Sequence, residues 1–344
     1  MPELKIYTVA DLREWLTNNH PAEGLSERVI APTRAWAIVH NPYVKDEDAI
    51  VAAIFEDGEL AAYTASFPDM LDGKRVWWAS TLYCYPKFTG KGYGLIVVGS
   101  LMEAHEPEST YDCCVVPETI EIFNHLGLQS ITKERYVYSE KTTFKPTLRG
   151  KLSHLRQSVM KRIHPWPKVE NGKYTLRYAS YIDGEAYAFI KKNKGNDLWL
   201  REQDMYNWIL RYPFKQGCVL KEVVASDCHY TSNMSSYEYK VVKVYNDSEL
   251  KGVYVLSIKS DTMSVVYLYY EESSQDIVFT SILDHCIQLK SKTIITENYT
   301  LVKYIEANLY YPIKQKNDIT LFVPQKERDF SKYTYQLGDG DHFV

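Results

Sequence analysis

The sequence has neither a strong excess of one charge nor a long hydrophobic run. Its 344 residues include 40 Lys and Arg against 44 Asp and Glu, which gives a formal net charge of −4 at pH 7. Without a global positive charge, the chain is not expected to attract nucleic acid. It contains no apolar run long enough for a membrane-spanning helix, and its first residues lack the apolar core of a signal peptide. We therefore expect a cytoplasmic protein with no nucleic-acid partner and no membrane span.

Cysteine motifs are missing too. The six cysteines form no Cys-x-x-Cys pair and have no histidines at zinc-binding spacing. They are Cys84, Cys113, Cys114, Cys218, Cys228 and Cys286. This pattern favours reduced, buried thiols over a disulfide scaffold or a zinc site. The Gly-Asp-Gly-Asp run at 338–341 lacks the remaining ligands of a calcium loop, so we expect no metal.

Two common nucleotide-binding motifs are also absent. No Gly-x-x-x-x-Gly-Lys-Ser/Thr run occurs, which excludes the nucleotide P-loop. The dinucleotide fingerprint Gly-x-Gly-x-x-Gly fails as well. Counted from Gly90 its third glycine would fall at Leu95, and counted from Gly92 it would fall at Val97. A phosphate site in this chain must therefore be of another kind.

The chain does contain a glycine-rich loop between an expected strand and an expected helix. Residues 76–85 are rich in β-branched and aromatic side chains, as strands are. The loop Pro86–Gly94 follows, and apolar residues then recur at helical spacing from Leu95 to Met102. Such a loop can turn several backbone amides toward one point at the positive end of a helix. We therefore predict a site for the pyrophosphate of a phosphate-bearing cofactor.

The pattern resembles the acetyl-CoA loop of the GNAT superfamily of N-acetyltransferases. In that family a strand ending Leu-x-(apolar)-x-Pro precedes (Arg/Gln)-Gly-x-Gly-x-Gly, and here Leu82–Pro86 and Gly90–Gly94 match. Thr89 stands where the family usually has Arg or Gln, so a hydroxyl replaces that side chain. The next expected strand and helix, at 111–116 and 118–126, follow in the family's order.

The resemblance implies both a fold and a chemistry. The expected fold class is α/β (α+β), with two GNAT-like mixed-sheet domains, each a central twisted sheet flanked by helices, and a helical connecting segment. The expected reaction moves an acetyl or other short acyl group from coenzyme A to an amine. The expected cofactor-binding residues are Leu82, Cys84, Thr89, Gly90, Lys91, Gly92, Tyr93 and Gly94.

The catalytic residues are less well marked. An amine near neutral pH must lose a proton before it attacks, so a base is required. No local motif identifies that base, and the candidates nearest the loop in sequence are Glu118, His125, Tyr83 and Tyr85. The family often has a tyrosine that protonates the leaving thiolate, and the matching position here is Phe123, which cannot donate a proton. Cys84 has no base motif beside it, so we do not expect it to act as a nucleophile.

The chain divides into two similar halves. Residues 1–145 are expected to form the acyl-CoA-binding domain, 146–225 a helical connecting segment, and 226–344 a degenerate GNAT-like domain with a C-terminal tail. The later half repeats the order of strands and helices but has Glu271–Gln275 in place of the glycine loop. Two carboxylates without a glycine would repel a pyrophosphate, so this half is expected to have lost cofactor binding.

Two short runs in the first half carry further expectations. Ala35–Val39 is apolar and is expected to begin the sheet. Asp57-Gly58 is expected to close a hairpin. At the other end of the chain, the tail with Asp339 and Asp341 either stays in solvent or folds back between the halves.

Three functions stay open. The first is a small-molecule N-acyltransferase whose amine acceptor lies in the interdomain cleft, preferably an amino sugar in surface-polysaccharide synthesis, by resemblance to bacterial tandem GNAT proteins. The second is a non-catalytic GNAT-like binding protein. The third is a Fem-like aminoacyl transferase, which the net charge of −4 and the absence of a long heptad run disfavour. The chain is expected to be a monomer or a homodimer.

Overall fold

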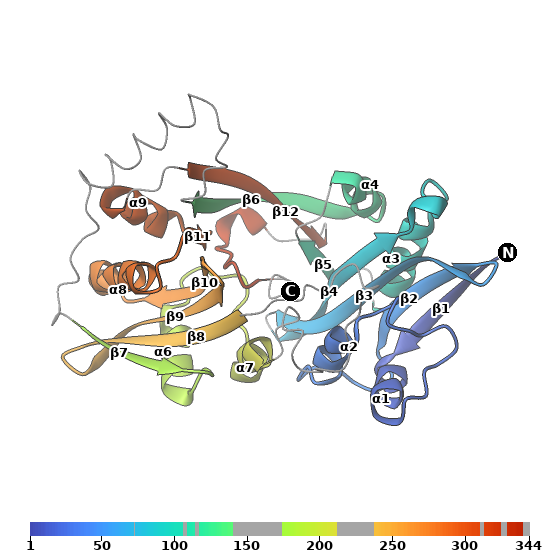
Figure 1. Cartoon of the computed structure of the whole chain (residues 1–344), viewed down its shortest axis with the longest axis horizontal. Helices are drawn as coiled ribbons and strands as arrows, with labels where there is room; N and C mark the ends of the chain where they lie inside the picture. Colours follow the sequence, from blue (N-terminus) through green and yellow to red (C-terminus); the bar gives the residue numbers. More distant parts are fainter. Residues whose placement is uncertain are drawn as a thin grey trace.

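The computed structural model describes residues 1–71, 73–105, 109–113, 117–139, 174–211, 237–309, 313–324 and 329–339 (Figure 1). Its strands are β1 (Pro2–Thr8), β2 (Ala49–Glu56), β3 (Glu59–Leu71), β4 (Lys74–Cys84), β5 (Thr110–Cys113), β6 (Leu128–Ser139), β7 (Thr175–Ala179), β8 (Tyr237–Asn246), β9 (Glu249–Lys259), β10 (Thr262–Tyr270), β11 (Thr293–Thr296) and β12 (Ile313–Pro324). Its α-helices are α1 (Val9–Asn18), α2 (Pro32–Val39), α3 (Tyr93–Ala104), α4 (Pro117–His125), α6 (Gly184–Asn193), α7 (Gln203–Arg211), α8 (Gln275–Gln288) and α9 (Tyr299–Asn308).

All of these strands belong to one mixed sheet. Their order is β1-β2-β3-β4-β5-β12-β6-β11-β10-β9-β8-β7. Figure 1 shows β1–β4 on one side of the molecule, β7–β10 on the other, and β6 and β12 crossing between them. The fold is therefore of the mixed α/β class, with two halves on a shared sheet. No helix in the described ranges is both long and apolar enough to span a membrane.

The two halves exchange a strand at the centre of this sheet. β12, from the end of the chain, lies between β5 and β6 of the first half, and β6 in turn pairs with β11 of the second half. β6 and β12 form an antiparallel ladder that runs from Leu128 opposite Pro324 to Ser139 opposite Ile313. Each half thus completes its sheet with a strand from the other, and the halves form one packed body.

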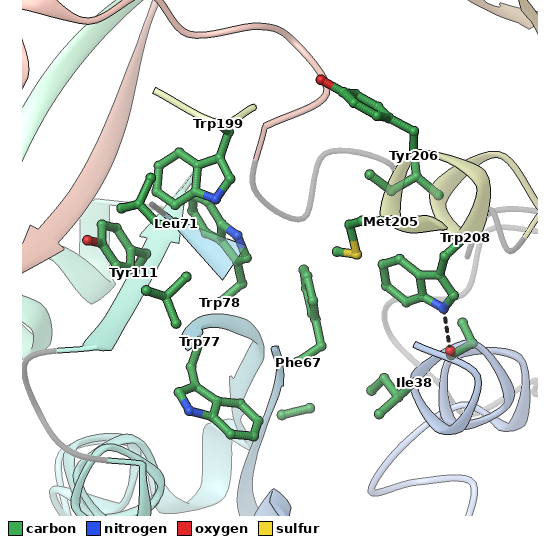
Figure 2. Close-up of a cluster of buried hydrophobic side chains, with 14 of the residues drawn as sticks. Ile38, Phe67, Leu71, Trp77, Trp78, Tyr111, Trp199, Met205, Tyr206 and Trp208 are labelled. Carbon is green, nitrogen blue, oxygen red and sulfur yellow. Dashed lines mark hydrogen bonds between the residues drawn. The ribbon is translucent and has the colours of Figure 1, made fainter. Parts of the chain in front are cut away.

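One hydrophobic core contains residues of both halves and of the segment around α7, and Figure 2 shows the part formed by the first half and that segment. Trp199, which precedes α7, lies 4.6 Å from Trp78 of β4 and 5.0 Å from Tyr111 of β5, measured between ring centroids. On α7 itself, the Trp208 indole N–H donates a hydrogen bond of 2.7 Å to the Ala37 carbonyl of α2. The segment that contains Trp199 and α7 therefore packs between the first half and the second. The described part of 146–225 also contains a strand, β7, which pairs with β8 at the edge of the sheet.

Hairpin turns form where the sequence predicts them. Asp57 and Gly58 have positive φ angles of 52° and 79° and join β2 to β3. Asp247 and Ser248, with φ angles of 48° and 70°, join β8 to β9 in the same way. Two consecutive residues with positive φ make the turn whose twist suits a hairpin. The same turn thus recurs at corresponding places in the two halves.

The prediction that Ala35–Val39 forms the first strand is wrong. These residues lie in α2, which begins with Pro32 in its first turn and is buried over most of its length. Proline is well suited to a helix start because the first amides have no helical partner. A short apolar run carries no clear period, so it is compatible with a buried helix as well as with a strand. The sheet begins instead at β1, an edge strand whose side chains are mostly exposed.

Candidate functional site

The site predicted from the glycine loop begins at the end of β4. β4 and β5 pair in parallel, with Trp77 opposite Thr110 and Trp78 opposite Tyr111. β4 itself continues to Cys84. A bulge in β4 follows, where Thr81 has a positive φ of 56° and the register with β3 shifts. Such a φ is uncommon for a β-branched residue and marks a bent strand. Of the described residues of β5, Thr110 and Tyr111 are paired with β4.

The glycine loop connects this strand end to α3. A 3₁₀ turn at Pro86–Phe88 leads into it, and Gly90 and Gly92 adopt φ angles of 84° and 78°. Only glycine takes such angles without strain, which explains two of the three glycines. Gly92 caps α3, and the amide of Ile96 bonds to its carbonyl at 3.2 Å. The amides of Gly92–Leu95 precede that bond and point outward from the helix start, which makes them suitable donors to an anion.

Gly94 is required for a different reason. A Cβ atom at this position would lie 3.1 Å from Ile122 Cδ1 of α4 and 3.9 Å from Leu82 Cδ1 of β4. The start of α3 is therefore packed closely against both the strand end and α4. This contact fixes the helix start, and with it the amides, relative to the end of β4.

Two lysines flank the loop and bind to the β2–β3 hairpin. The Lys91 ammonium lies 2.6 Å from a Glu56 carboxylate oxygen, and Lys87 lies 2.6 Å from Glu59. The hydrogen bond to Glu56 raises the pKa of Lys91, and the same bond lowers the pKa of Glu56. Lys91, an expected cofactor-binding residue, thus holds the loop to the hairpin in this structure. Thr89 is exposed beside it.

Cys84 and Tyr83 lie on opposite faces of the strand. Cys84 packs on the α3 side, where burial raises the pKa of its thiol. A thiol with a raised pKa is a poor nucleophile, which agrees with the sequence-based argument. Tyr83 packs on the other side, with ring centroids 5.9 Å from Tyr63 and 5.0 Å from Tyr85. Tyr83 therefore faces the layer that contains α2, away from the glycine loop.

Of the two α4 candidates, the structure describes the side chain of His125 alone. His125 is exposed at the last residue of α4, and its Nδ1 lies 2.8 Å from the Glu121 carbonyl of its own helix. It comes three residues after Ile122, whose Cδ1 atom lies close to Gly94. The backbone of Glu118 is in the first turn of α4, and its side chain lies outside the described residues. Whether any of these residues acts as the base stays a prediction.

Phe123 belongs to the core. Its side chain is 1% exposed, and its ring centroid lies 5.1 Å from that of Phe322 on β12. The position that matches the family's proton donor is therefore turned toward the exchanged strand.

One buried charged cluster was not found from the sequence. Arg201, which is fully buried between the halves, lies 3.0 Å from Asp69 of β3 and 3.0 Å from Asp339 of the C-terminal segment. Asp339 is 3% exposed, so this residue follows the folded-back alternative for the tail rather than the solvated terminus, which is the default expectation. Nothing in the sequence links it to Arg201, because 138 residues separate the two.

No protein-family model and no curated protein sequence matches this chain. Solved structures do match. A conserved protein of unknown function from Enterococcus faecalis V583, named a probable N-acyltransferase, is 13% identical with a TM-score of 0.53, over 97% of this chain and 75% of its own. A tandem GNAT protein from the clavulanic acid biosynthesis pathway is 10% identical with a TM-score of 0.51, over 96% and 100%.

A GCN5-related N-acetyltransferase from Kribbella flavida is 12% identical with a TM-score of 0.50, over 93% of this chain and 70% of its own. At such low identities the likeness concerns the fold. It agrees with the bulged strand, the glycine loop and the helix start described above. The chain has the fold of the GCN5-related N-acetyltransferases, in a tandem arrangement.

Proposed function

We propose that the first half binds an acyl-coenzyme A and transfers its acetyl or other short acyl group to an amine of a small molecule. The observation that carries this proposal is the junction of β4 with α3. There, a strand with a bulge at Thr81 is followed by two glycines with positive φ and a helix start. This combination presents amide donors to a pyrophosphate beside a strand end that suits an extended, amide-bearing chain.

Each part of the junction has a role in this proposal. The amides of Gly92–Leu95, with the Thr89 hydroxyl, bind the pyrophosphate. The backbone at Leu82 and Cys84 binds the pantetheine arm and orients the thioester carbonyl, toward which a strand amide donates. Acyl-coenzyme A would supply the activated thioester. The amine nitrogen attacks its carbonyl carbon, the C–N bond forms as the C–S bond breaks, coenzyme A leaves as the thiolate, and the proton lost by the amine passes through a base to give the free thiol.

The acceptor that we propose to test first is an amino sugar. The charge near the loop does not select one acceptor, because its two lysines are paired with glutamates. A panel of amines therefore has to include amino sugars, amino acids and polyamines, with release of free thiol as the readout.

A second candidate function is binding of coenzyme A without catalysis. The observation that favours it is the burial of Phe123 against Phe322, which leaves no phenol at the family's proton-donor position. In that case the protein would bind acetyl-CoA and show no thiol release with any amine of the panel.

The binding test is calorimetric titration of acetyl-CoA into the wild type and two matched variants. Gly92 and Gly195 both have positive φ and open space around them, so Gly92→Glu and Gly195→Glu impose comparable backbone strain. Gly92→Glu also places a carboxylate at the helix start, and we expect it to weaken binding by about tenfold or more. Gly195→Glu should bind as the wild type does. Absence of binding by the wild type would refute both candidate functions.

A further inference from the structure

The second half contains a counterpart of the β4 strand end. The Tyr85 amide bonds to the Ala61 carbonyl at 2.9 Å, and the Glu271 amide bonds to the Lys251 carbonyl at 3.1 Å. A 3₁₀ turn follows directly in both places, at Pro86–Phe88 and at Glu272–Ser274. Counting back from these bonds aligns Leu82 of β4 with Leu268 of β10. The backbone of Leu268 therefore occupies the place that the pantetheine-binding strand end has in the first half.

The counterpart lacks the phosphate loop. Four residues, Thr89–Gly92, separate the first 3₁₀ turn from α3. In the second half the turn ends at Ser274 and α8 begins at Gln275, with no residue between them. The carboxyl-bearing residues Glu271 and Glu272 stand at this junction. The loop that carries the predicted pyrophosphate site in the first half thus has no counterpart at this junction.

The strand edge itself is present, and the chain's own C-terminal segment covers it. β10 pairs in parallel with β11 from Thr262 to Ser264, has a bulge around Val266, and continues to Tyr270. The Gly338 amide donates to the Val266 carbonyl at 3.0 Å. The Gln336 side-chain amide accepts a bond from the Leu268 amide and donates one to the Leu268 carbonyl, each at 3.3 Å. A carboxamide group thus bonds to this strand edge as a peptide group would.

The fit at this edge is tight. The Tyr267 hydroxyl donates to the Gly338 carbonyl at 2.7 Å. A Cβ atom at Gly338 would lie only 2.3 Å from Cζ of the Tyr267 ring, so no larger residue fits without displacement. Gln336 and Asp339 are buried. The segment is therefore packed into the strand edge along its described length.

We propose that Gln336–Asp339 is a built-in occupant of the second half's pantetheine slot. The occupant and the missing phosphate loop together restrict acyl-coenzyme A binding to the first half of each chain. The identity of the displaced ligand rests on the function proposed above, whereas the occupancy of the β10 edge rests on the bonds of Gln336 and Gly338. The occupant replaces an exchangeable ligand with a fixed part of the chain.

The same segment couples the filled slot to the first half. Asp339 accepts a bond from Arg201, and Arg201 also bonds to Asp69 on β3, the neighbour of β4. The backbone amide of Gln336 donates a hydrogen bond of 2.7 Å to Asp339 Oδ2, which holds that carboxylate in place. Seating of the segment at β10 thus positions Arg201 between the halves.

The test compares Gly338→Ala with Gly184→Ala in the full-length protein. Gly184 lies at the start of α6 with open space around it, so its substitution should change nothing locally. Gly338→Ala should displace the segment, and the amides of Val266–Tyr270 should exchange hydrogen about tenfold faster or more, while β3 changes less. Gln336→Ala, which removes the two bonds to Leu268 and a third to the Asp197 carboxylate without a clash, is the milder second variant and should act in the same direction. Unchanged exchange in both variants would overturn the proposal.

Titration of acetyl-CoA into the wild type and Gly338→Ala gives the stoichiometry. One site per chain in both proteins supports the proposal, because the missing phosphate loop keeps the opened slot from binding tightly. Two sites in the wild type would overturn it. No site in the wild type would refute the proposed function, and the exchange experiment would still decide whether the segment fills the β10 edge.

Discussion

Arg201 and Asp69 form a fully buried ion pair across the two halves of the molecule. The Arg201 Nε atom lies 3.0 Å from Asp69 Oδ2, both side chains are 0% exposed, and 132 residues separate them along the chain. The Trp78 indole donates a further bond of 3.2 Å to the same Asp69 oxygen. Charges this deep are tolerated only when their partners are in place. Loss of either partner should therefore destabilise the interface between the halves.

Removal of the cation should destabilise the protein strongly. Arg201→Met leaves the carboxylates of Asp69 and Asp339 buried without their shared partner, which should lower the free energy of unfolding by about 3–5 kcal/mol. The control is Lys87→Met, which breaks an exposed pair with Glu59 and should cost about 1 kcal/mol or less. Urea unfolding of the two variants measures both effects. Similar losses in the two variants would contradict a special role for Arg201.

Asp197 should make stability fall as the pH rises. Burial, and then the charge of Asp339, raise the pKa of Asp197 from 3.8 to about 7. Between these values the folded protein holds a proton that the unfolded chain has lost, so the free energy of unfolding decreases with rising pH. The contribution is complete below about pH 4 and is lost by about pH 7.

Substitution of Asp197 tests this dependence. Asp197→Asn keeps the shape without the titrating proton, so relative to wild type its free energy of unfolding should rise by about 2–3 kcal/mol between pH 5 and pH 8. Asp204→Asn, at an exposed position of α7, is the control and should show no such relative change. A wild-type curve parallel to that of Asp197→Asn would rule the effect out.

Gly94, the third glycine of the loop, should tolerate substitution only if a smaller side chain on α4 makes room for it. Gly94→Ala brings a methyl group to 3.1 Å from Ile122 Cδ1, so it should shift α3 and weaken acetyl-CoA binding several-fold. Ile122→Val removes that atom, and the double variant should regain most of the affinity. Gly99→Ala is the control, because its methyl group would lie at an ordinary contact distance of 3.5 Å from Leu126. Alanine also has a higher helix propensity than glycine. Equal effects of the two alanines on binding would count against this packing argument.

Local features were predictable from the sequence because a few adjacent residues determine them. Asp57-Gly58 specifies its turn, and Gly90 and Gly92 specify positive φ angles wherever the chain folds. The helix after the loop follows from the apolar spacing that starts at Leu95. The strand end, the loop and the helix start could therefore be assigned to one site.

Long-range features could not be predicted in this way. The exchange of β6 and β12 pairs residues that are up to 196 positions apart, such as Leu128 and Pro324. Both strands would look the same in an unexchanged arrangement, since each pairs through its backbone. The seating of Gln336 on Leu268 likewise depends on a strand edge formed elsewhere in the chain. The prediction for Ala35–Val39 was wrong for a local reason, because a run of five apolar residues does not distinguish a helix from a strand.

Restoring the family's tyrosine should harm the protein rather than activate it. Phe123 is 1% exposed and packs against Phe322, so the hydroxyl of Phe123→Tyr would enter the core beside an apolar ring. An unsatisfied buried hydroxyl costs about 1–3 kcal/mol, which should appear as a lower midpoint of urea unfolding. Acetyl transfer to any amine that the wild type accepts should not increase. The control is Phe123→Leu, which loses ring contacts but adds no polar group. A rise in turnover with Phe123→Tyr at unchanged stability would show instead that this side chain reaches the reacting thiol.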